Sequence, residues 1–417
     1  YGSRTIAMVR NNKEELNRNF SEILSIHIIF SIIVIFVYLV LLFFFVEDNL
    51  VIFLIQSIYV FAAVFDINWF FFGIEKFKLT VGRNTLVKIL SVFLVLVFVK
   101  TQTDLWIYAL ILALSVFVGQ SVVWFALKQY VSWRRPSWAN MKQHIRPLFV
   151  LFLPILALSL YKYMDKIMLG SISSNVQVGF YENAEKIINV PMSLIMAFGV
   201  VLMPRIANMV TSKDKGEVFK LIDMSMEAVM LLAIAISFGL AGISFVLAPI
   251  FFGYEFEECG ILIMGLAVTV PFMAFANVIR TQYLIPYKED KIFVVSLFLG
   301  AAVNLIVNII LIPYMAARGA VIGTIFAEII VCIYQSYFVR KKIFIKKYLL
   351  NTIPPILIGI VMFVFVFQIG NVMNINIVTL ILQLLVGMFI YAVGVFLLML
   401  KSRTRLMVLL RKFVVRY

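Results

Sequence analysis

The chain has 417 residues, of which 63% are hydrophobic and only 14% are charged, and its formal net charge is +15. Soluble domains average about 45–50% apolar and about 25% charged residues, so a water-soluble fold is excluded and the solvent must be lipid. The charge is not that of a nucleic-acid-binding protein, because Lys and Arg lie in short loops between apolar runs and not on one polar domain.

Twelve apolar segments are long enough, or nearly so, to cross a bilayer as helices, which takes about 20 residues. In chain order they are Ser21–Val46, Leu50–Gly73, Thr85–Val99, Leu105–Leu127, Pro147–Leu169, Ala184–Met209, Leu221–Ala248, Ile261–Tyr283, Ile292–Ile312, Gly319–Val339, Tyr348–Gln368 and Ile377–Leu400. Thr85–Val99 is short, and we expect snorkelling from Arg83–Lys88 to extend it. We predict an all-α polytopic membrane protein.

The basic residues predict the orientation of the spans. Successive connections between the spans lie on alternate sides of the membrane. The connections on one side hold 31 of the 36 Lys and Arg residues, whereas those on the other side hold only Lys100, Lys186 and Arg318. By the positive-inside rule, residue 1 and the C-terminus are therefore cytoplasmic. The longest outer connection, Gly170–Asn183, has 14 residues, so we expect no extracellular domain. The connections that hold 31 of the 36 Lys and Arg residues are Tyr1–Phe20, Ile74–Lys88, Lys128–Arg146, Arg205–Lys220, Arg280–Lys291, Arg340–Lys347 and Lys401–Tyr417.

Catalytic and metal-binding patterns are not apparent in the sequence. Two cysteines and two histidines in separate regions predict neither a disulfide framework nor a metal site. No GxSxG, HExxH, P-loop or DxD pattern is found, so we predict a protein that is not an enzyme and needs no cofactor. The basic, amphipathic tail Lys401–Tyr417 is expected to lie on the cytoplasmic leaflet.

An internal repeat relates the two halves of the chain. Residues 4–9 read RTIAMV and residues 205–210 read RIANMV, an offset of 201 that places Ser21–Val46 on residues 222–247. The offset predicts two further helices before residue 1, and thus a parent of 14 spans in which both copies have the same orientation. The domains expected from this repeat are an N-terminal lobe (1–127), a C-terminal six-helix lobe (147–339), a terminal pair (348–400) and the basic tail (401–417).

Several stretches, taken in chain order, are similar to one known family. They are YGSRTIAMVRNNKEELNRNFSEI (1–23), YKYMDKIMLGSISSNVQVGFYENAEKI (161–187), VLMPRIANMV (201–210), IRTQYLIPYKEDK (279–291) and RGAVIGTIFAE (318–328). Together they resemble the Wzx-type polysaccharide and O-antigen flippases, from which the chain departs by an absent N-terminus.

That resemblance implies a fold and a function. The family belongs to the multidrug/oligosaccharidyl-lipid/polysaccharide exporter (MOP) superfamily, with a MATE-like fold of two six-helix lobes around a central cavity. It implies alternating access in the bacterial inner membrane. The implied substrate is an undecaprenyl-diphosphate-linked oligosaccharide, moved to the outer leaflet for O-antigen, capsule or exopolysaccharide synthesis, with polymerase and chain-length proteins as partners.

A basic cluster is the first candidate for holding the diphosphate. Lys162, Asp165 and Lys166 lie at i, i+3 and i+4, on one face of a helix. Lys162 or Lys166 could bind phosphate, and the neighbouring Asp165 would modulate the charge of that lysine. The alternative is that Asp165 pairs with a lysine and that both snorkel to the outer interface.

Further basic candidates lie on the spans that follow. Lys186, with Glu182 and Glu185, opens the next helix, where a solvated helix start is the alternative. Arg205, at the inner end of that helix, could receive substrate or could be a positive-inside anchor; Arg4 is its counterpart in the repeat. Arg280, beside Thr281 and Gln282, is a candidate for the cavity.

Two carboxylates within apolar spans are candidates for coupling to H⁺ or Na⁺. Asp66 lies beside Asn68, and Glu328 lies in the middle of GTIFAEII. Charges within spans are functional candidates by default. The alternative for both is a protonated or paired carboxylate that supports helix packing.

Three other functions remain open. A cation-coupled multidrug exporter and a lipid II flippase would share the fold. A membrane-bound oligosaccharide polymerase or ligase would need a larger outer loop than this sequence provides.

Overall fold

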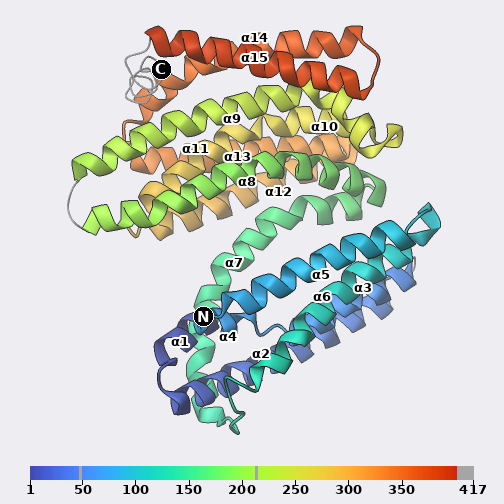
Figure 1. Cartoon of the computed structure of the whole chain (residues 1–417), viewed down its shortest axis with the longest axis vertical. Coiled ribbons are helices and arrows are strands. Elements are labelled where there is room, and N and C mark those ends of the chain that lie inside the picture. Colours follow the sequence, from blue (N-terminus) through green and yellow to red (C-terminus); the bar gives the residue numbers. More distant parts are fainter. Residues whose placement is uncertain (47–48, 212–214, 402–417) are drawn as a thin grey trace. The chain divides into compact units, whose positions relative to one another are not determined.

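The computed structural model describes residues 1–46, 49–211 and 215–401, and every element within them is a helix (Figure 1). The chain divides into two compact units, Tyr1–Leu153 and Pro154–Tyr417. The tail from residue 402 onward, which the sequence predicts to be amphipathic, lies outside the described residues.

Two elements of the first unit start at residues whose side chains cap them. Asn12 accepts hydrogen bonds from the backbone N–H groups of Glu14 and Glu15 at the start of α2, and Thr101 forms a capping box with Asp104. Its elements are α1 (Gly2–Val9), α2 (Lys13–Phe45), α3 (Leu50–Val64), α4 (Asn68–Gly73), α5 (Phe77–Phe98), η1 (Gln102–Asp104), α6 (Leu105–Leu127) and the first part of α7 (Trp138–Ile172).

The second unit contains the longer helices and the larger buried core. A short π-helix, η3 (Arg280–Leu284), follows α11. The elements after α7 are α8 (Asn175–Thr211), α9 (Lys215–Phe252), η2 (Tyr254–Phe256), α10 (Glu258–Ala267), α11 (Thr269–Ile279), η3, α12 (Asp290–Met315), α13 (Ala317–Val339), α14 (Ile345–Val372) and α15 (Ile377–Lys401).

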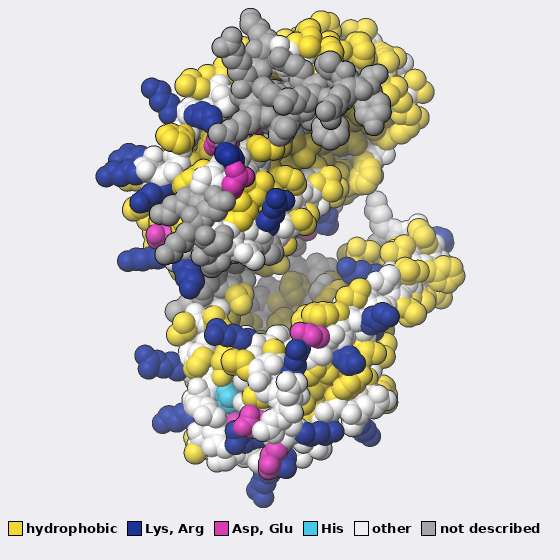
Figure 2. Space-filling view, turned by 60° about the vertical axis from the view of Figure 1, so that its left-hand side comes forward, with side chains coloured by type: hydrophobic (Ala, Val, Ile, Leu, Met, Phe, Trp, Pro, Cys, Tyr) yellow, Lys and Arg dark blue, Asp and Glu magenta, His cyan; other side chains and the backbone are white. Residues whose placement is uncertain are grey.

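Eleven helical segments of the described chain are long and apolar enough to cross a membrane. They coincide with eleven of the twelve predicted spans, so the chain is a multi-pass membrane protein. The other predicted span, Pro147–Leu169, lies inside the 35-residue helix α7, whose side chains are described only in part. Figure 2 shows the outward apolar surface expected of helices in lipid: hydrophobic side chains cover broad areas, and Lys and Arg far outnumber Asp and Glu.

Two boundary predictions are wrong. The third span is longer than predicted, because α5 already begins at Phe77, eight residues before Thr85, and snorkelling from Arg83–Lys88 stays a prediction. The predicted outer connection Gly170–Asn183 is not a loop, since α7 continues to Ile172 and α8 begins at Asn175.

The order of elements agrees with the internal repeat. In both units a long helix (α2 or α9) is followed by an interrupted span (α3–α4 or α10–α11) and two further long helices. Equivalent pairs are in contact: α2 with α3 and α9 with α10, then α5 with α6 and α12 with α13. The terminal pair α14 and α15 packs on α9 in the second unit (Figure 1).

Candidate functional site

Asp165, on α7, is the centre of a buried polar network that joins four helices. Its Oδ1 accepts hydrogen bonds from the side-chain amides of Asn304 (2.8 Å) and Asn308 (2.5 Å) on α12. Its Oδ2 accepts hydrogen bonds from the hydroxyls of Tyr181 on α8 (2.8 Å) and Thr324 on α13 (3.1 Å). Neutral donors therefore hold this carboxylate, which is only 5% exposed.

The local structure of α12 and α13 brings these groups together. Asn304 and Asn308 are four residues apart and so lie on one face of α12. Gly323 lets α13 approach that face, because a Cβ atom there would lie 2.1 Å from the Asn308 Oδ1. That Oδ1 is buried and has no hydrogen-bond partner among the described residues. The network therefore retains an acceptor that another ligand could use.

Lys166 does not pair with Asp165, so the alternative in which Asp165 pairs with this lysine is wrong. The Lys166 ammonium instead forms ion pairs with Glu182 and with Glu185 (2.8 Å) on α8. Lys162 is exposed, and its ammonium lies 5.6 Å from the centroid of the Tyr163 ring. The two lysines thus differ, since Lys166 is neutralised by carboxylates and Lys162 faces outward.

The charged residues of α8 lie further into the helix than the sequence predicts. Because α8 begins at Asn175, the residues Glu182, Glu185 and Lys186 lie about two to three turns into the helix and not at its start. Lys186 lies 3.6 Å from Glu182 and keeps 62% of its side chain exposed. Its charge is therefore available at the surface of the α7–α8 hairpin.

Arg280 and Gln282 lie in the π-helix η3 but in different surroundings. Arg280 is half-buried, and its guanidinium donates a hydrogen bond to the Asn277 Oδ1 (2.6 Å) and lies 5.3 Å from the centroid of Phe293. Gln282 is fully buried, and neither atom of its amide has a partner among the described residues. Of this predicted pair, only Arg280 can reach a soluble group.

The two predicted coupling-ion residues are also in different positions. Asp66 lies between α3 and α4, where its Oδ1 accepts a hydrogen bond from the backbone N–H of Asn68 (3.0 Å). Glu328 is buried on α13, one turn after Thr324 and on the same face. Arg205, on α8, is exposed, as is Arg4 on α1.

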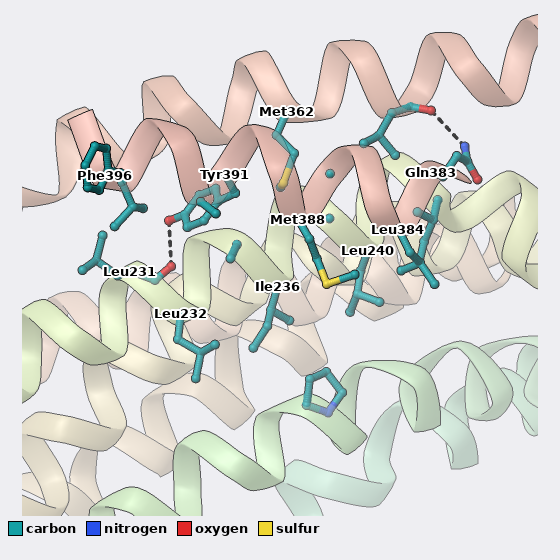
Figure 3. Close-up of a pocket in the computed structure, with 18 of the residues that line it drawn as sticks. Leu231, Leu232, Ile236, Leu240, Met362, Gln383, Leu384, Met388, Tyr391 and Phe396 are labelled. Carbon is teal, nitrogen blue, oxygen red and sulfur yellow. Dashed lines mark hydrogen bonds between the residues drawn. The ribbon is translucent and has the colours of Figure 1, made fainter. Parts of the chain in front are cut away.

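An open, apolar groove of about 960 Å³ runs between α9, α14 and α15. Figure 3 shows Leu232, Ile236 and Leu240 on α9 facing Met388 on α15 across it. Two of its few polar groups are already bonded, since the Tyr391 hydroxyl donates to the Leu231 carbonyl (2.7 Å) and the Gln383 side-chain NH₂ donates to the Val366 carbonyl (2.9 Å), while the buried Gln383 Oε1 has no partner among the described residues. The groove can therefore accept a hydrocarbon chain but offers little to a sugar.

Sequence reasoning missed the partners of Asp165, which are Tyr181, Asn304, Asn308 and Thr324. A usable signal was present in the two asparagines, four residues apart in an otherwise apolar helix. Polar side chains at that spacing inside a span form a single polar patch that needs a partner. Within the described residues, no group of three or more His, Cys, Asp or Glu side chains could hold a metal ion.

Known proteins resemble this chain in sequence. The family described as "Polysaccharide biosynthesis protein" matches residues 2–210. A protein of Shigella dysenteriae named "Putative O-antigen transporter" is 24% identical over 339 residues, which cover 78% of this chain and 82% of that protein.

Solved structures resemble it in fold. The structure titled "Lipid II flippase MurJ, inward closed conformation" has a TM-score of 0.72 at 16% identity, over 94% of this chain and 87% of that one. An outward-facing multidrug resistance MATE family transporter of the MOP superfamily has a TM-score of 0.52 at 14% identity, over 82% of each chain. The predicted MATE-like, all-α fold is thereby confirmed.

Proposed function

We propose, from the premise that this chain belongs to the polysaccharide biosynthesis protein family, that it is a flippase for undecaprenyl-diphosphate-linked oligosaccharide repeat units. It would carry them from the cytoplasmic to the outer leaflet by alternating access, as a step in O-antigen, capsule or exopolysaccharide synthesis. Residue 1 and the C-terminus would be cytoplasmic, as the basic connections indicate. Polymerase and chain-length proteins would receive the product.

The observation that carries this proposal is the apolar groove between α9, α14 and α15. A diphosphate and a glycan cannot cross hydrocarbon unaided, whereas the lipid tail attached to them can stay in it. Leu232, Met388 and Phe396 remain 45%, 62% and 46% exposed, so the groove is open to the side. A carrier of free sugars or of soluble drugs would have no need of such a surface.

Basic side chains would hold the diphosphate. Lys162 and the side chain of Lys186 are exposed, and Arg280 is half-buried. Charge-assisted hydrogen bonds to phosphate oxygens are about twice as strong as neutral ones. Arg205 would meet the substrate at the inner end of α8, while Lys166 and Gln282 would act by supporting their neighbours.

The coupling ion, a proton or Na⁺, would bind at Asp165 in this proposal. Rotation of the Asn304 and Asn308 amides would turn two carbonyl oxygens towards the carboxylate. Together with the hydroxyls of Tyr181 and Thr324, they would give the oxygen surroundings that hard cations require. Glu328 is close enough along α13 to contribute, whereas Asp66 is engaged at the start of α4.

Deletion of the gene tests the function. We expect loss of the surface glycan and accumulation of the lipid-linked repeat unit on the cytoplasmic face, both reversed by complementation. Drug export with normal glycan would instead indicate a multidrug exporter, and a lethal deletion rescued by a lipid II flippase would indicate lipid II as substrate. Polymerised product made by the purified protein would reveal a polymerase or ligase.

Substitution of Lys162 by alanine tests the phosphate contact. We expect transport to fall about tenfold at unchanged abundance, because a hydrogen bond to a charged group contributes about 1.5–3 kcal/mol. Lys100→Ala, which removes another exposed lysine from a predicted outer connection, is the control and should transport normally. Full transport by Lys162→Ala in everted vesicles would remove Lys162 from the proposed site.

A further inference from the structure

A second cavity, of about 720 Å³, lies between α9, α11, α13 and α14. Its volume is within the range of about 300–1,000 Å³ that is usual for ligand sites. Two of the hydroxyl groups that line it already donate to backbone carbonyls: Ser237 to Ala267 (2.7 Å) and Thr352 to Tyr348 (2.8 Å). Most of the other lining side chains are apolar, so a ligand inside the cavity would mainly meet hydrocarbon.

Arg340 gives one end of this cavity a positive charge. It follows the last residue of α13, and its guanidinium lies 3.7 Å from the centroid of the Tyr337 ring. Within the described part of the chain, no carboxylate oxygen is within 4.0 Å of it. Asp223 does not neutralise it, because that carboxylate is bound by Lys347 (2.7 Å) and Tyr348 (2.5 Å).

The length of the cavity matches the hydrocarbon thickness of one leaflet. Its lining on α13 runs from Ile329 to Arg340, about 16 Å at 1.5 Å per residue. Half of a hydrocarbon core about 30 Å thick is about 15 Å. The cavity is therefore as deep as one acyl chain is long, with the charge at its interfacial end.

This cavity is distinct from the groove assigned to the transported lipid. The groove uses Leu231, Leu232 and Ala235 of α9, whereas the cavity uses Met230, Ile234 and Ser237. No residue lines both. The two spaces therefore lie on different faces of α9, and a lipid could stay in the cavity while substrate occupies the groove.

We propose that this cavity binds an anionic phospholipid of the membrane, with one acyl chain between the helices and its phosphate at Arg340. Basic pockets between spans on the cytoplasmic side are suited to anionic head groups. Exposed Lys341 and Lys342, beside Arg340, add to the attraction. The site does not depend on which glycan is carried, so it can be tested apart from transport.

Lipid retention, measured by native mass spectrometry, tests the role of the positive charge of Arg340. The chain is released from nanodiscs of equal phosphatidylglycerol and phosphatidylcholine, and we expect one retained phosphatidylglycerol. Arg340→Gln should lower that retention about fivefold, the equivalent of about 1 kcal/mol for one basic residue at the surface. Lys341→Gln is the matched variant and should lower retention less, because it removes an equally charged neighbour that does not line the cavity. Equal losses in the two variants would overturn the site.

Filling the cavity with a larger side chain tests whether it binds an acyl chain, without changing the charge of the protein. Ile333 lines it and is 57% exposed, whereas Leu357, 58% exposed on α14, does not line it. Ile333→Trp should abolish retention, and Leu357→Trp should not. Retention by both variants, or equal retention of phosphatidylcholine by the wild type, would refute the proposal. Capture of the lipid-linked oligosaccharide in place of phosphatidylglycerol would also refute it.

Discussion

Replacement of Asp165 by alanine is expected to lower both the abundance and the thermal stability of the protein. Thr324 and Tyr181 have other acceptors, since Thr324 also lies 3.0 Å from the Ala320 carbonyl and the two hydroxyls lie 2.7 Å apart. The loss therefore falls on the amides of Asn304 and Asn308. Each amide loses the acceptor of one buried N–H group, although the Asn308 amide still donates to the Asn304 Oδ1 (3.2 Å). Two buried N–H groups without an acceptor cost about 2–6 kcal/mol at about 1–3 kcal/mol each, a large part of a typical stability of about 5–15 kcal/mol.

Asp165→Asn removes the negative charge but can keep the hydrogen bonds of the network. Its amide oxygen can still accept from Asn304 and Asn308, and its NH₂ group can donate to the two hydroxyls. We therefore expect near-normal unfolding temperature in detergent but a loss of transport of about 5- to 150-fold, the usual range of coupling between two ligands.

The test of Asp165 needs a control variant and has one outcome that would contradict the prediction. Glu255→Gln, which alters an exposed carboxylate in η2, is the control and should leave transport unchanged. Wild-type transport by Asp165→Asn, with the same response to proton and sodium gradients, would show that the network is only structural.

Substitution of Gly319 by alanine is expected to destabilise the α12–α13 hairpin. A Cβ atom at this position would lie 2.7 Å from the carbonyl carbon and oxygen of Leu311 and 2.9 Å from the backbone nitrogen of Ile312. Backbone atoms cannot rotate away, so the helices would have to separate. Overpacking of this kind costs about 1–3 kcal/mol and occasionally more.

Gly179, on α8, is the matched control for Gly319. A Cβ atom there would meet nothing within 4 Å. Gly179→Ala should be neutral or stabilising by up to about 1 kcal/mol, through helix propensity alone. Thermal unfolding in detergent compares the two. If both variants unfold at the wild-type temperature, the close approach of the helices does not limit stability.

The glycines also account for a motif on which the family resemblance depended. RGAVIGTIFAE contains Gly319 and Gly323 four residues apart, the spacing at which helices in membranes approach closely. Gly319 meets the backbone of α12, and Gly323 meets Asn308. The same short stretch therefore permits the hairpin and completes the network around Asp165, since Thr324 follows directly.

The spans could be predicted because backbone groups in lipid must bond within their own helix, which makes a long apolar run decisive. The ends could not, because polar residues extend the helices by tertiary contacts. Arg83 illustrates this: its guanidinium donates to the Gly119 carbonyl (2.6 Å) and to Asn68 (3.1 Å), so the polar start of α5 is held by other helices.

The partners of Asp165 were beyond sequence reasoning for a related cause. The i, i+4 rule compares neighbours on one helix and so pointed to a lysine. Three of the groups that bond it are 139 to 159 residues away on α12 and α13, and the fourth, Tyr181, is on the next helix, α8. Local spacing could identify Asp165 as noteworthy, but only the fold could show that neutral amides and hydroxyls surround it.

The π-helical turn at Arg280–Leu284 bears on how sequences of this kind should be aligned. Such a turn accommodates an inserted residue without ending the helix. Because each α-helical residue turns the chain by about 100°, one insertion presents a new side of the span beyond it. A homologue without that residue would place different side chains opposite Gly199. A single-position gap here would therefore mark a change of helix face and not merely of length.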